Sequence, residues 1–338
     1  MTEANPLPIA VDAMGGDDAP GVIIEGARKA HAEYRVPVVL VGRPEDLSDI
    51  GDLPVMPASE VIAMDADGAS AVRKMKDSSL VVAAEAVRDG KAGAMFGAGN
   101  TGATMASALL RMGRTSGVAR PAIATPIPTP GGKPTLLLDA GANAECQPMW
   151  LHQFAQMGAV FSRVRFGVER PKVGLLSIGE EPSKGNKLTK EVHELLADEA
   201  WQEALDVEFV GNIEGRDLMG SGVADVAVTD GFTGNVALKT LEGSMKSVIN
   251  GLLSAFDAND DARAASATLW PALEPLYREL DPNVTGGAML LGLKGVCVIG
   301  HGSSSVDGVC NGIRVAAELV SSGLVEAIAS AVSPASSA

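Results

Sequence analysis

The segment from Ala94 to Met112 reads Ala-Met-Phe-Gly-Ala-Gly-Asn-Thr-Gly-Ala-Thr-Met-Ala-Ser-Ala-Leu-Leu-Arg-Met, and it decides the fold. Its first part, Ala94–Phe96, is a short apolar run typical of a buried strand. A glycine-rich turn follows at Gly97–Gly102, and the amphipathic pattern over Thr101–Met112 predicts a helix. A strand that enters a helix through a glycine turn is the repeating unit of a parallel α/β sheet.

The same unit recurs along the 338-residue chain. Further strands are predicted at Ile9–Asp12, Val38–Val41, Ala122–Thr125, Thr135–Asp139, Lys172–Ile178, Val207–Val210, Asp225–Thr229 and Val296–Ile299. Amphipathic helices are predicted between several of them, at Gly21–Tyr34, Leu80–Arg88 and Leu188–Ala197. The pattern predicts an α/β fold with a mainly parallel sheet and helices on both faces. We assign residues 1–332 to this domain and the Ser/Ala/Pro-rich residues 333–338 to a flexible tail.

Seven of the predicted strands end in polar, glycine-rich turns. These are Asp12–Asp17, Gly97–Gly102, Asp139–Asn143, Gly179–Gly185, Gly211–Arg216, Asp230–Asn235 and Gly300–Ser305. In an open parallel sheet the carboxyl ends of the strands line the ligand crevice, so we expect all seven turns at one edge. Helix N-termini that follow such turns offer free N–H groups to an anion, which favours a phosphate-bearing ligand.

One long helical segment interrupts the alternation. Apolar residues recur with helical spacing from Val236 to Phe256, and a second helix follows the acidic stretch Asp257–Asp261. We predict a projecting helical hairpin over residues 234–282, with Trp270 near its tip. Packing of a second copy is one use of such a hairpin, and a membrane-touching tip is the other. The acidic residues Asp257, Asp260 and Asp261 disfavour contact between the tip and a membrane.

The composition excludes several classes of protein. Lys and Arg total 27 against 42 Asp and Glu, so the net charge of −15 disfavours binding to nucleic acid. The chain has three cysteines without a C-x-x-C pair, which indicates a reducing compartment. There is neither a signal-peptide pattern nor an apolar run of bilayer-spanning length. These features predict a cytoplasmic protein.

Familiar catalytic and cofactor motifs do not fit the sequence. Gly97–Gly102 has the dinucleotide spacing, but Ala103–Leu138 lacks the acidic residue that would hold a ribose. Gly179–Gly185 is followed by Asn186 and not by the lysine of a P-loop. The four histidines are scattered, so we predict neither a metal nor an organic cofactor. Asp12, Asp139 and Asp230 could either hold Mg²⁺ or order loops, and we favour loop ordering through N-capping and turn hydrogen bonds.

Other polar residues in these turns are candidates for the chemistry. His301 follows an apolar strand and could exchange a proton or pair with phosphate; capping the strand is the alternative. Lys184 either forms a surface ion pair with a neighbouring carboxylate or contacts a phosphate or an oxyanion of the substrate. Arg73, with Lys74 and Lys76, either receives an anion or lies on a solvated face. The substrate-binding candidates are Asp12, Arg73, Gly99, Asn100, Thr101, Gly102, Asn143, Asp230, Asn235, Gly302, Ser303 and Ser304.

The same turns resemble the PlsX family of bacterial phosphate acyltransferases. The matching segments are Ala10–Asp17 with Ala19 and Pro20, Val72–Ser79, Gly99–Ala103, Leu138–Asn143, Ile178–Glu181, Gly211–Asp217, Asp230–Asn235 and His301–Ser304. They occur in the family's order over nearly the whole chain. The resemblance implies a Rossmann-like multi-layer sandwich, similar to phosphotransacetylases and to isocitrate and isopropylmalate dehydrogenases.

The resemblance also implies an activity and partners. Acyl-[acyl carrier protein] and inorganic phosphate would give acyl phosphate, which the membrane-bound glycerol-3-phosphate acyltransferase then uses. Family members are homodimers, and some contact the membrane peripherally through a helical hairpin. Because phosphate is itself the nucleophile, no covalent acyl-enzyme is expected. We assign oxyanion contacts to Lys184 and Asn212, general acid catalysis to His301, and phosphate binding to Gly99–Gly102 and Gly302–Ser304.

Recognition of an acidic carrier protein requires a local basic patch on this acidic chain. We expect it around Arg111, Arg114 and Arg120, or around Arg163, Arg165, Arg170 and Lys172. Three other functions stay open. A phosphotransacetylase-like enzyme would prefer coenzyme A thioesters. A catalytically weak scaffold would not need the polar turns, and a dehydrogenase would need the missing ribose-binding acid.

Overall fold

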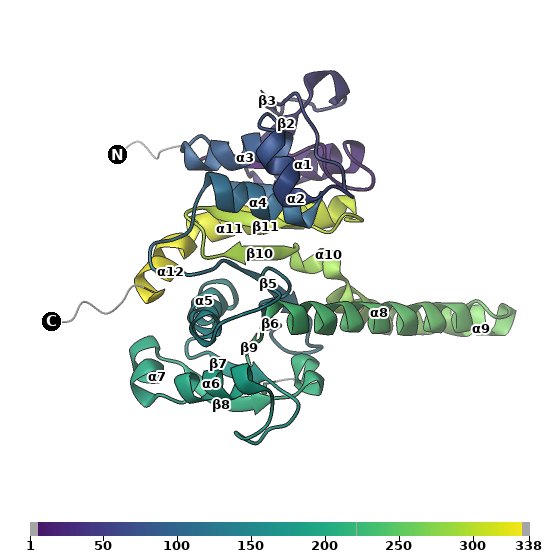
Figure 1. Ribbon diagram of the computed structural model, residues 1–338. Coiled ribbons are helices and arrows are strands. Elements are labelled where there is room, and N and C mark those ends of the chain that lie inside the picture. The colour runs from purple at the N-terminus through teal and green to yellow at the C-terminus, as the bar shows by residue number, and fades with distance from the viewer. Residues whose placement is uncertain (1–5, 221, 333–338) are drawn as a thin grey trace, which may run out of the picture.

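A computed structural model describes residues 6–220 and 222–332 of the chain (Figure 1), so the predicted tail at 333–338 lies outside the described residues. One eleven-stranded sheet runs through the molecule in the order β3-β2-β1-β4-β11-β10-β5-β6-β9-β7-β8. Its strands are β1 (Ile9–Asp12), β2 (Val38–Gly42), β3 (Val55–Pro57), β4 (Ala94–Gly97), β5 (Ala122–Ile127), β6 (Thr135–Leu138), β7 (Lys172–Leu176), β8 (Glu208–Ile213), β9 (Val226–Val228), β10 (Ala288–Leu291) and β11 (Val296–Ile299).

Helices cover both faces of this sheet, as the sequence predicts. The first face carries α1 (Gly21–Tyr34), α5 (Pro148–Phe166), α6 (Lys187–Leu196), α11 (Val306–Ser321) and α12 (Leu324–Val332). The second face carries α2 (Gly68–Lys74), α3 (Ser79–Arg88), α4 (Thr101–Arg111) and the first turns of α8 (Gly231–Phe256). Shorter elements are α7 (Glu199–Leu205), α10 (Pro282–Thr285) and the 3-10 turns at Pro44–Asp46 and Gly215–Met219. The buried apolar side chains form one layer on each face.

All nine predicted strands are present, but β3 and β10 were missed. β10 has only four residues, and it follows Gly286 and Gly287, which both have a positive φ. It also pairs antiparallel with its neighbours β11 and β5. A short strand without a following helix gives no β-turn-α signal, so the sequence pattern does not reveal it.

The direction of the strands reverses at β10 and β5, which lie near the middle of the sheet (Figure 1). β10 is antiparallel to β11 and β5, and β5 is antiparallel to β6. The strands β3, β2, β1, β4 and β11 are parallel to one another. The strands β6, β9, β7 and β8 form a second parallel set that runs in the opposite direction.

This reversal places the glycine-rich turns at two edges of the sheet. The first residue of β10, Ala288, pairs with Ile299 at the end of β11, whereas its last residue, Leu291, pairs with the first residue of β5. The turn after β6 lies at that second end, where Asp139 accepts a hydrogen bond from the amide of Ile123 in β5. The expectation of one common edge is therefore wrong. By strand pairing, the turns after β1, β4 and β11 belong to one end of the sheet, and those after β6, β9, β7 and β8 belong to the other.

The predicted helical hairpin is confirmed and projects from the body of the molecule (Figure 1). It consists of α8 and α9 (Asp260–Leu280), and no residue of α9 is buried. Residues 257–259 connect the two helices and form the tip. Trp270 lies in the middle of α9, about 15 Å along the helix from its first residue, so the prediction that it lies near the tip is wrong. Among the described residues no single helix is long and apolar enough to span a membrane, although α11 and α12 pass together as a bent pair by length and composition.

Candidate functional site

The turns after β1, β4 and β11 form the first cluster of candidate residues. The amide of Asp17 donates to the carbonyl of Gly302 at 2.8 Å, and the amide of Gly300 donates to the carbonyl of Gly97 at 2.9 Å. A Cβ atom at Gly15 would lie 2.8 Å from the Cα atom of Gly99, so the two turns touch through their backbones. The structure thus brings the two predicted phosphate-binding turns, Gly99–Gly102 and Gly302–Ser304, into one place.

Asn100 holds this cluster together through its side chain. Its Oδ1 atom caps α4 by accepting the amide of Ala103 at 2.9 Å. Its Nδ2 group donates to the carbonyls of Ala66 at 2.8 Å and Met64 at 2.9 Å, in the loop before α2. The amide side chain is therefore engaged in positioning the turn. The exposed Thr101 and Gly102 at the start of α4 are the parts of the turn that face outward.

His301 belongs to the same cluster, and its side chain is exposed. Its Nδ1 atom lies 2.8 Å from Oγ of Ser303 and 3.3 Å from the amide nitrogen of Ser303. A backbone N–H can only donate, so Nδ1 is an acceptor and we assign the ring proton of the neutral form to Nε2. A histidine in this tautomer presents a proton donor to a group that approaches from outside the cluster.

Asp12 lies beneath these turns and is fully buried. Its Oδ1 atom accepts the amide of Met14 at 3.1 Å, so it orders its own loop as expected. Burial raises the pKa of Asp12 from 3.8 to about 6, although hydrogen bonds from the Ser79 hydroxyl and the Met14 amide act in the opposite direction. A carboxyl group that ionises near pH 6 makes the stability of this cluster depend on pH.

The Asp12→Asn variant is expected to lose part of the pH dependence of folding. Folded Asp12 keeps its proton up to about pH 6, whereas the unfolded chain releases it near 3.8. Protonated Asp12 therefore raises the free energy of unfolding below pH 4, and this contribution is lost as the pH rises through 6. The loss is on the order of 3 kcal/mol. Urea unfolding at pH 4 to 7 should show the variant gaining stability relative to the natural protein over that interval; a constant difference would contradict this.

The turns after β6 and β9 form a second cluster around Asp139. This buried carboxylate accepts the amides of Ile123, Gly141, Ala142 and Asn143 at 2.8–3.1 Å, and the side-chain amide of Asn143 at 2.9 Å. Burial raises the pKa of Asp139, and these hydrogen bonds oppose the rise. The expected loop-ordering role of Asp139 is confirmed.

Asp230 and Asn235 join this cluster to the start of α8. Asp230 caps α8 by accepting the amide and hydroxyl of Thr233 at 2.9 and 2.8 Å, which confirms its expected loop-ordering role. The Nδ2 group of Asn235 donates to the carbonyl of Ala140 at 3.2 Å. Asn143 accepts the amide of Gly231 through its own carbonyl at 2.8 Å. The predicted residues Asn143, Asp230 and Asn235 are therefore brought together, and their side chains are engaged at least in part with the backbone.

Gly234 is the closest contact between α8 and this cluster. A Cβ atom at Gly234 would lie 1.9 Å from the carbonyl oxygen of Asp139, so Gly234→Ala must displace α8 from the turn. We expect this variant to lower the free energy of unfolding by about 2 kcal/mol or more. Gly243→Ala is a matched control in the same helix, because a Cβ atom there would meet nothing within 4 Å. It should raise the free energy of unfolding by about 0.5–1 kcal/mol, and equal effects in urea titrations would contradict the close contact.

Lys184 and Asn212 belong to a third cluster, at the ends of β7 and β8. The exposed Lys184 side chain lies over Gly179, where a Cβ atom would be 2.9 Å from the lysine Cγ. Lys184 forms no ion pair within the described part of the chain. Its amide donates to the carbonyl of Glu181 at 2.9 Å, and Nδ2 of Asn212 donates to the same oxygen at 2.8 Å. Because the Asn212 side chain is buried and engaged, it positions the Lys184 turn and does not reach outward as an oxyanion contact.

His193 in α6 completes this third cluster, and sequence reasoning missed it. Its Nδ1 atom lies 3.0 Å from Oδ1 of Asn212. Since Nδ2 of Asn212 already donates to Glu181, Oδ1 is an acceptor and Nδ1 of His193 carries the proton. A lone histidine on a helix gives no sequence signal for a contact with a strand 19 residues away.

The thiols of the chain have raised pKa values, and the described residues show no cluster of metal-ligating side chains. Burial raises the pKa of Cys146 to about 12 and that of Cys297 to about 12, and it also raises the pKa of Cys310. Such thiols are poor nucleophiles at neutral pH. Within residues 6–220 and 222–332, no group of three or more His, Cys, Asp or Glu side chains is arranged to hold a metal ion.

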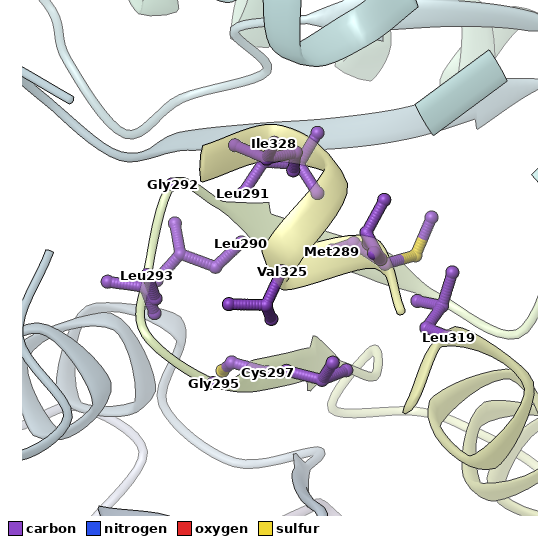
Figure 2. A pocket seen from close by; sticks show the side chains of 12 residues that line it. Met289, Leu290, Leu291, Gly292, Leu293, Gly295, Cys297, Leu319, Val325 and Ile328 are labelled. Carbon is purple, nitrogen blue, oxygen red and sulfur yellow. The ribbon is translucent and has the colours of Figure 1, made fainter. Parts of the chain in front are cut away.

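The enclosed cavity beside β10 and β11 is separate from these clusters. Figure 2 shows that it is lined by apolar side chains from β10, β11 and α12, among them Leu291, Cys297 and Ile328. Its volume of about 10 Å³ leaves no space for an organic ligand. It is a packing seam of the core.

Comparisons with known proteins agree with this architecture. The family described as "Fatty acid synthesis protein" matches residues 7–327. Proteins named phosphate acyltransferase from Nostoc punctiforme and Elusimicrobium minutum are 45% and 47% identical, over 95% of this chain and 95% and 94% of theirs. Among solved structures, the EutD phosphotransacetylase from Staphylococcus aureus has a TM-score of 0.61 at 16% identity, covering 93% of this chain and 94% of its own. The 4-hydroxythreonine-4-phosphate dehydrogenase from Klebsiella pneumoniae has a TM-score of 0.50 at 14% identity, covering 93% and 99%. The predicted phosphotransacetylase-like fold is confirmed.

Proposed function

The chain belongs to the PlsX family of phosphate acyltransferases in fatty acid and phospholipid synthesis, and from this premise we propose that it transfers the acyl group of an acyl-[acyl carrier protein] thioester directly to inorganic phosphate. A phosphate oxygen forms a bond to the acyl carbon while the bond from that carbon to sulfur breaks. The carrier protein leaves as a thiol after its sulfur takes a proton. The product is an acyl phosphate, which a glycerol-3-phosphate acyltransferase consumes.

The observation that carries this proposal is the first cluster of glycine turns. Two turns, Gly99–Gly102 and Gly302–Ser304, meet beside His301 and expose backbone at the start of α4. Amides at a helix N-terminus bind phosphate well. As the imidazolium, His301 would give its Nε2 proton to the departing thiolate and return to neutral imidazole. We assign Lys184 to the thioester carbonyl oxygen, where negative charge develops during attack.

Trapping with hydroxylamine tests the reaction. Purified protein, long-chain acyl carrier protein and phosphate should give an acyl hydroxamate only when phosphate is present. Product from acyl-coenzyme A and none from the carrier-protein thioester would favour the phosphotransacetylase reaction. Absence of product with both donors would refute acyl transfer to phosphate and would favour the scaffold hypothesis.

Direct attack must be distinguished from an acyl-serine intermediate. The hydroxyl of Ser303 lies 2.8 Å from Nδ1 of His301, a pairing that also occurs in serine nucleophiles. The thiols, whose pKa values are raised, are unsuited to that role. In the absence of phosphate, a single-turnover experiment should release no carrier-protein thiol, and Ser303→Ala should still form acyl phosphate. A stoichiometric burst of thiol that Ser303→Ala abolishes would refute direct attack.

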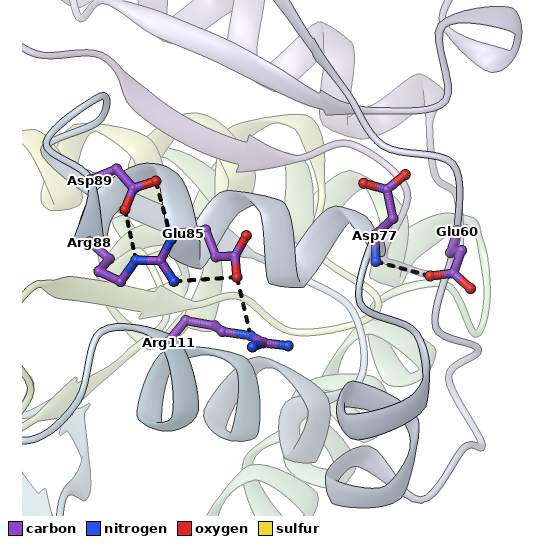
Figure 3. A network of polar contacts seen from close by, with 6 residues as sticks. All are labelled: Glu60, Asp77, Glu85, Arg88, Asp89 and Arg111. Atoms are coloured by element: carbon purple, nitrogen blue, oxygen red, sulfur yellow. Dashed lines mark hydrogen bonds and ion pairs between the residues drawn. The ribbon is translucent and has the colours of Figure 1, made fainter.

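The two basic patches expected from the sequence are engaged within the chain. Arg111 pairs with Glu85, which also contacts Arg88 in the network of Figure 3. Arg114 donates to the carbonyl of Ala119, and Arg120 stacks on Trp150. In the second patch, Arg163 and Lys172 donate to backbone carbonyls, while Arg165 and Arg170 pair with carboxylates. Three of these seven cations therefore pair with carboxylates, and the contacts of the other four are to neutral groups.

Arg73, Lys74 and Lys76, at the end of α2, are better placed to meet the carrier protein. All three are exposed, and none forms an ion pair with a residue in 6–220 or 222–332. The start of α2 packs on the phosphate turn, since a Cβ atom at Gly68 would lie 2.3 Å from the amide nitrogen of Ala103. A carrier protein docked on these cations would hold its thioester near the first cluster.

Charge reversal of Lys74 and Lys76 should weaken the binding of the carrier protein without affecting the binding of phosphate. We expect Lys74→Glu/Lys76→Glu to raise KM for acyl carrier protein about tenfold, with KM for phosphate unchanged and with a weaker response to added salt. Lys187→Glu is a control on α6, where the side chain is 90% exposed. An equal response of both variants would refute docking at α2.

The hairpin is the proposed surface for a second copy of the chain. Exposed apolar side chains recur along it, at Val248, Leu252, Leu253, Leu269 and Leu276. The connection at its tip lies beside Asp260 and Asp261, which disfavour an anionic membrane surface. Homodimerisation through α8 and α9 is the use that these observations favour.

A further inference from the structure

Three large apolar side chains are exposed at the end of the sheet that carries the second and third clusters. Ile178, just after β7, is 81% exposed; Phe232 and Val236, in the first two turns of α8, are 67% and 52% exposed. We name these three residues the apolar rim. A group of exposed apolar side chains costs solubility, and such groups usually mark a binding surface.

Strand pairing places the members of the apolar rim at the same edge. β7 and β9 are adjacent and parallel, with Leu175 paired to Val228. Ile178 and Gly231 are each the third residue after this pair, so Ile178 emerges level with the start of α8. Phe232 and Val236 are four residues apart and therefore lie on one face of α8.

The apolar rim adjoins the groups proposed for catalysis. Ile178 directly precedes Gly179, over which the side chain of Lys184 lies. Phe232 follows the Asp230 cap and the Gly231 amide, which is bonded to the turn of Asn143. An acyl thioester has its polarised carbonyl at one end of an apolar chain. A carbonyl held at Lys184 would therefore direct its chain toward the apolar rim.

We propose that the apolar rim binds the acyl chain of the thioester substrate, selecting long chains over short ones. This inference rests on the proposed function, in which Lys184 contacts the thioester carbonyl. Burial of methylene groups against apolar side chains favours binding in proportion to chain length.

The test compares long-chain and butyryl thioesters with the full-length Ile178→Ser/Phe232→Ser variant. We expect kcat/KM for the long-chain substrate to fall roughly 10- to 100-fold and that for the butyryl substrate to change less than about twofold. Phe232→Leu, which keeps an apolar side chain, should retain most of the long-chain activity. Leu110→Ser, at an exposed position of α4, is the control and should leave both activities unchanged.

Several outcomes would overturn the proposal. Equal losses on both substrates would assign these residues to the reaction centre, and unchanged activity on both would show that the rim is not used. Light scattering that shows loss of a dimer in the variant would assign the rim to a second copy of the chain. These results differ from failure of the proposed function, in which the unmodified protein itself forms no acyl phosphate from any thioester.

Discussion

Replacement of His301 by glutamine is expected to lower kcat by about 10²- to 10⁴-fold for the carrier-protein thioester. Nδ1 of His301 accepts hydrogen bonds from Ser303, so its Nε2–H is the group that faces an incoming substrate. Glutamine preserves polarity and approximate size but is a far weaker acid. The leaving alkyl thiolate would then depart without its proton. The measurement is the rate of acyl hydroxamate formation at saturating phosphate.

The leaving group provides the control for this role. An aryl thioester releases a stable thiolate that needs no proton, so it should be turned over by His301→Gln at nearly the normal rate. Equal losses with alkyl and aryl thioesters would show that His301 is not the general acid. A rise in KM for phosphate with kcat unchanged would instead assign His301 to phosphate binding.

Replacement of Lys184 by alanine is expected to lower kcat by about 10²- to 10³-fold, the usual cost of losing one oxyanion donor. Lys184 is exposed, and no carboxylate among the described residues pairs with its ammonium group. KM for phosphate should change little, because the phosphate turns lie at the other edge of the sheet. Steady-state kinetics with each substrate varied in turn will separate the two effects.

Lys187→Ala is the matched control for Lys184. Lys187 starts α6 only three residues further along, but it is 90% exposed and pairs with Glu191 at 3.6 Å. Its loss should leave kcat within about twofold, as for most exposed ion pairs. Near-normal turnover of both Lys184→Ala and His301→Gln would refute the proposed mechanism while leaving the family unchanged.

Asn212 illustrates what sequence reasoning could not settle. Its place at the end of a strand made it a candidate for the oxyanion, but in the folded chain it bridges His193 and the carbonyl of Glu181. Asn100 is similar, since its side chain joins α4 to the loop before α2. In both cases the partner lies 19 or more residues away. Residue type indicates capacity for hydrogen bonds, whereas the partners depend on packing.

The elements and their turns were determined by local sequence. Apolar runs, glycine turns and helical periodicity act over about 20 residues, so β1, β4, β11 and their turns could be predicted from Ile9, Ala94 and Val296 onward. The loop-ordering roles of Asp139 and Asp230 followed from the same local chemistry. The family resemblance rested on these turns too, and the comparisons confirm it.

The division of the candidate site between two edges was decided only by the tertiary structure. It depends on β10, whose four residues follow two glycines. β10 pairs antiparallel with β11 and with β5, and these two neighbours lie far apart from each other in the sequence. Pairing direction is a property of two chains side by side and leaves no periodic trace in either one. The sequence alone therefore determined which turns carry polar groups, and strand pairing decided that the turns of His301 and Lys184 lie at opposite edges of the sheet.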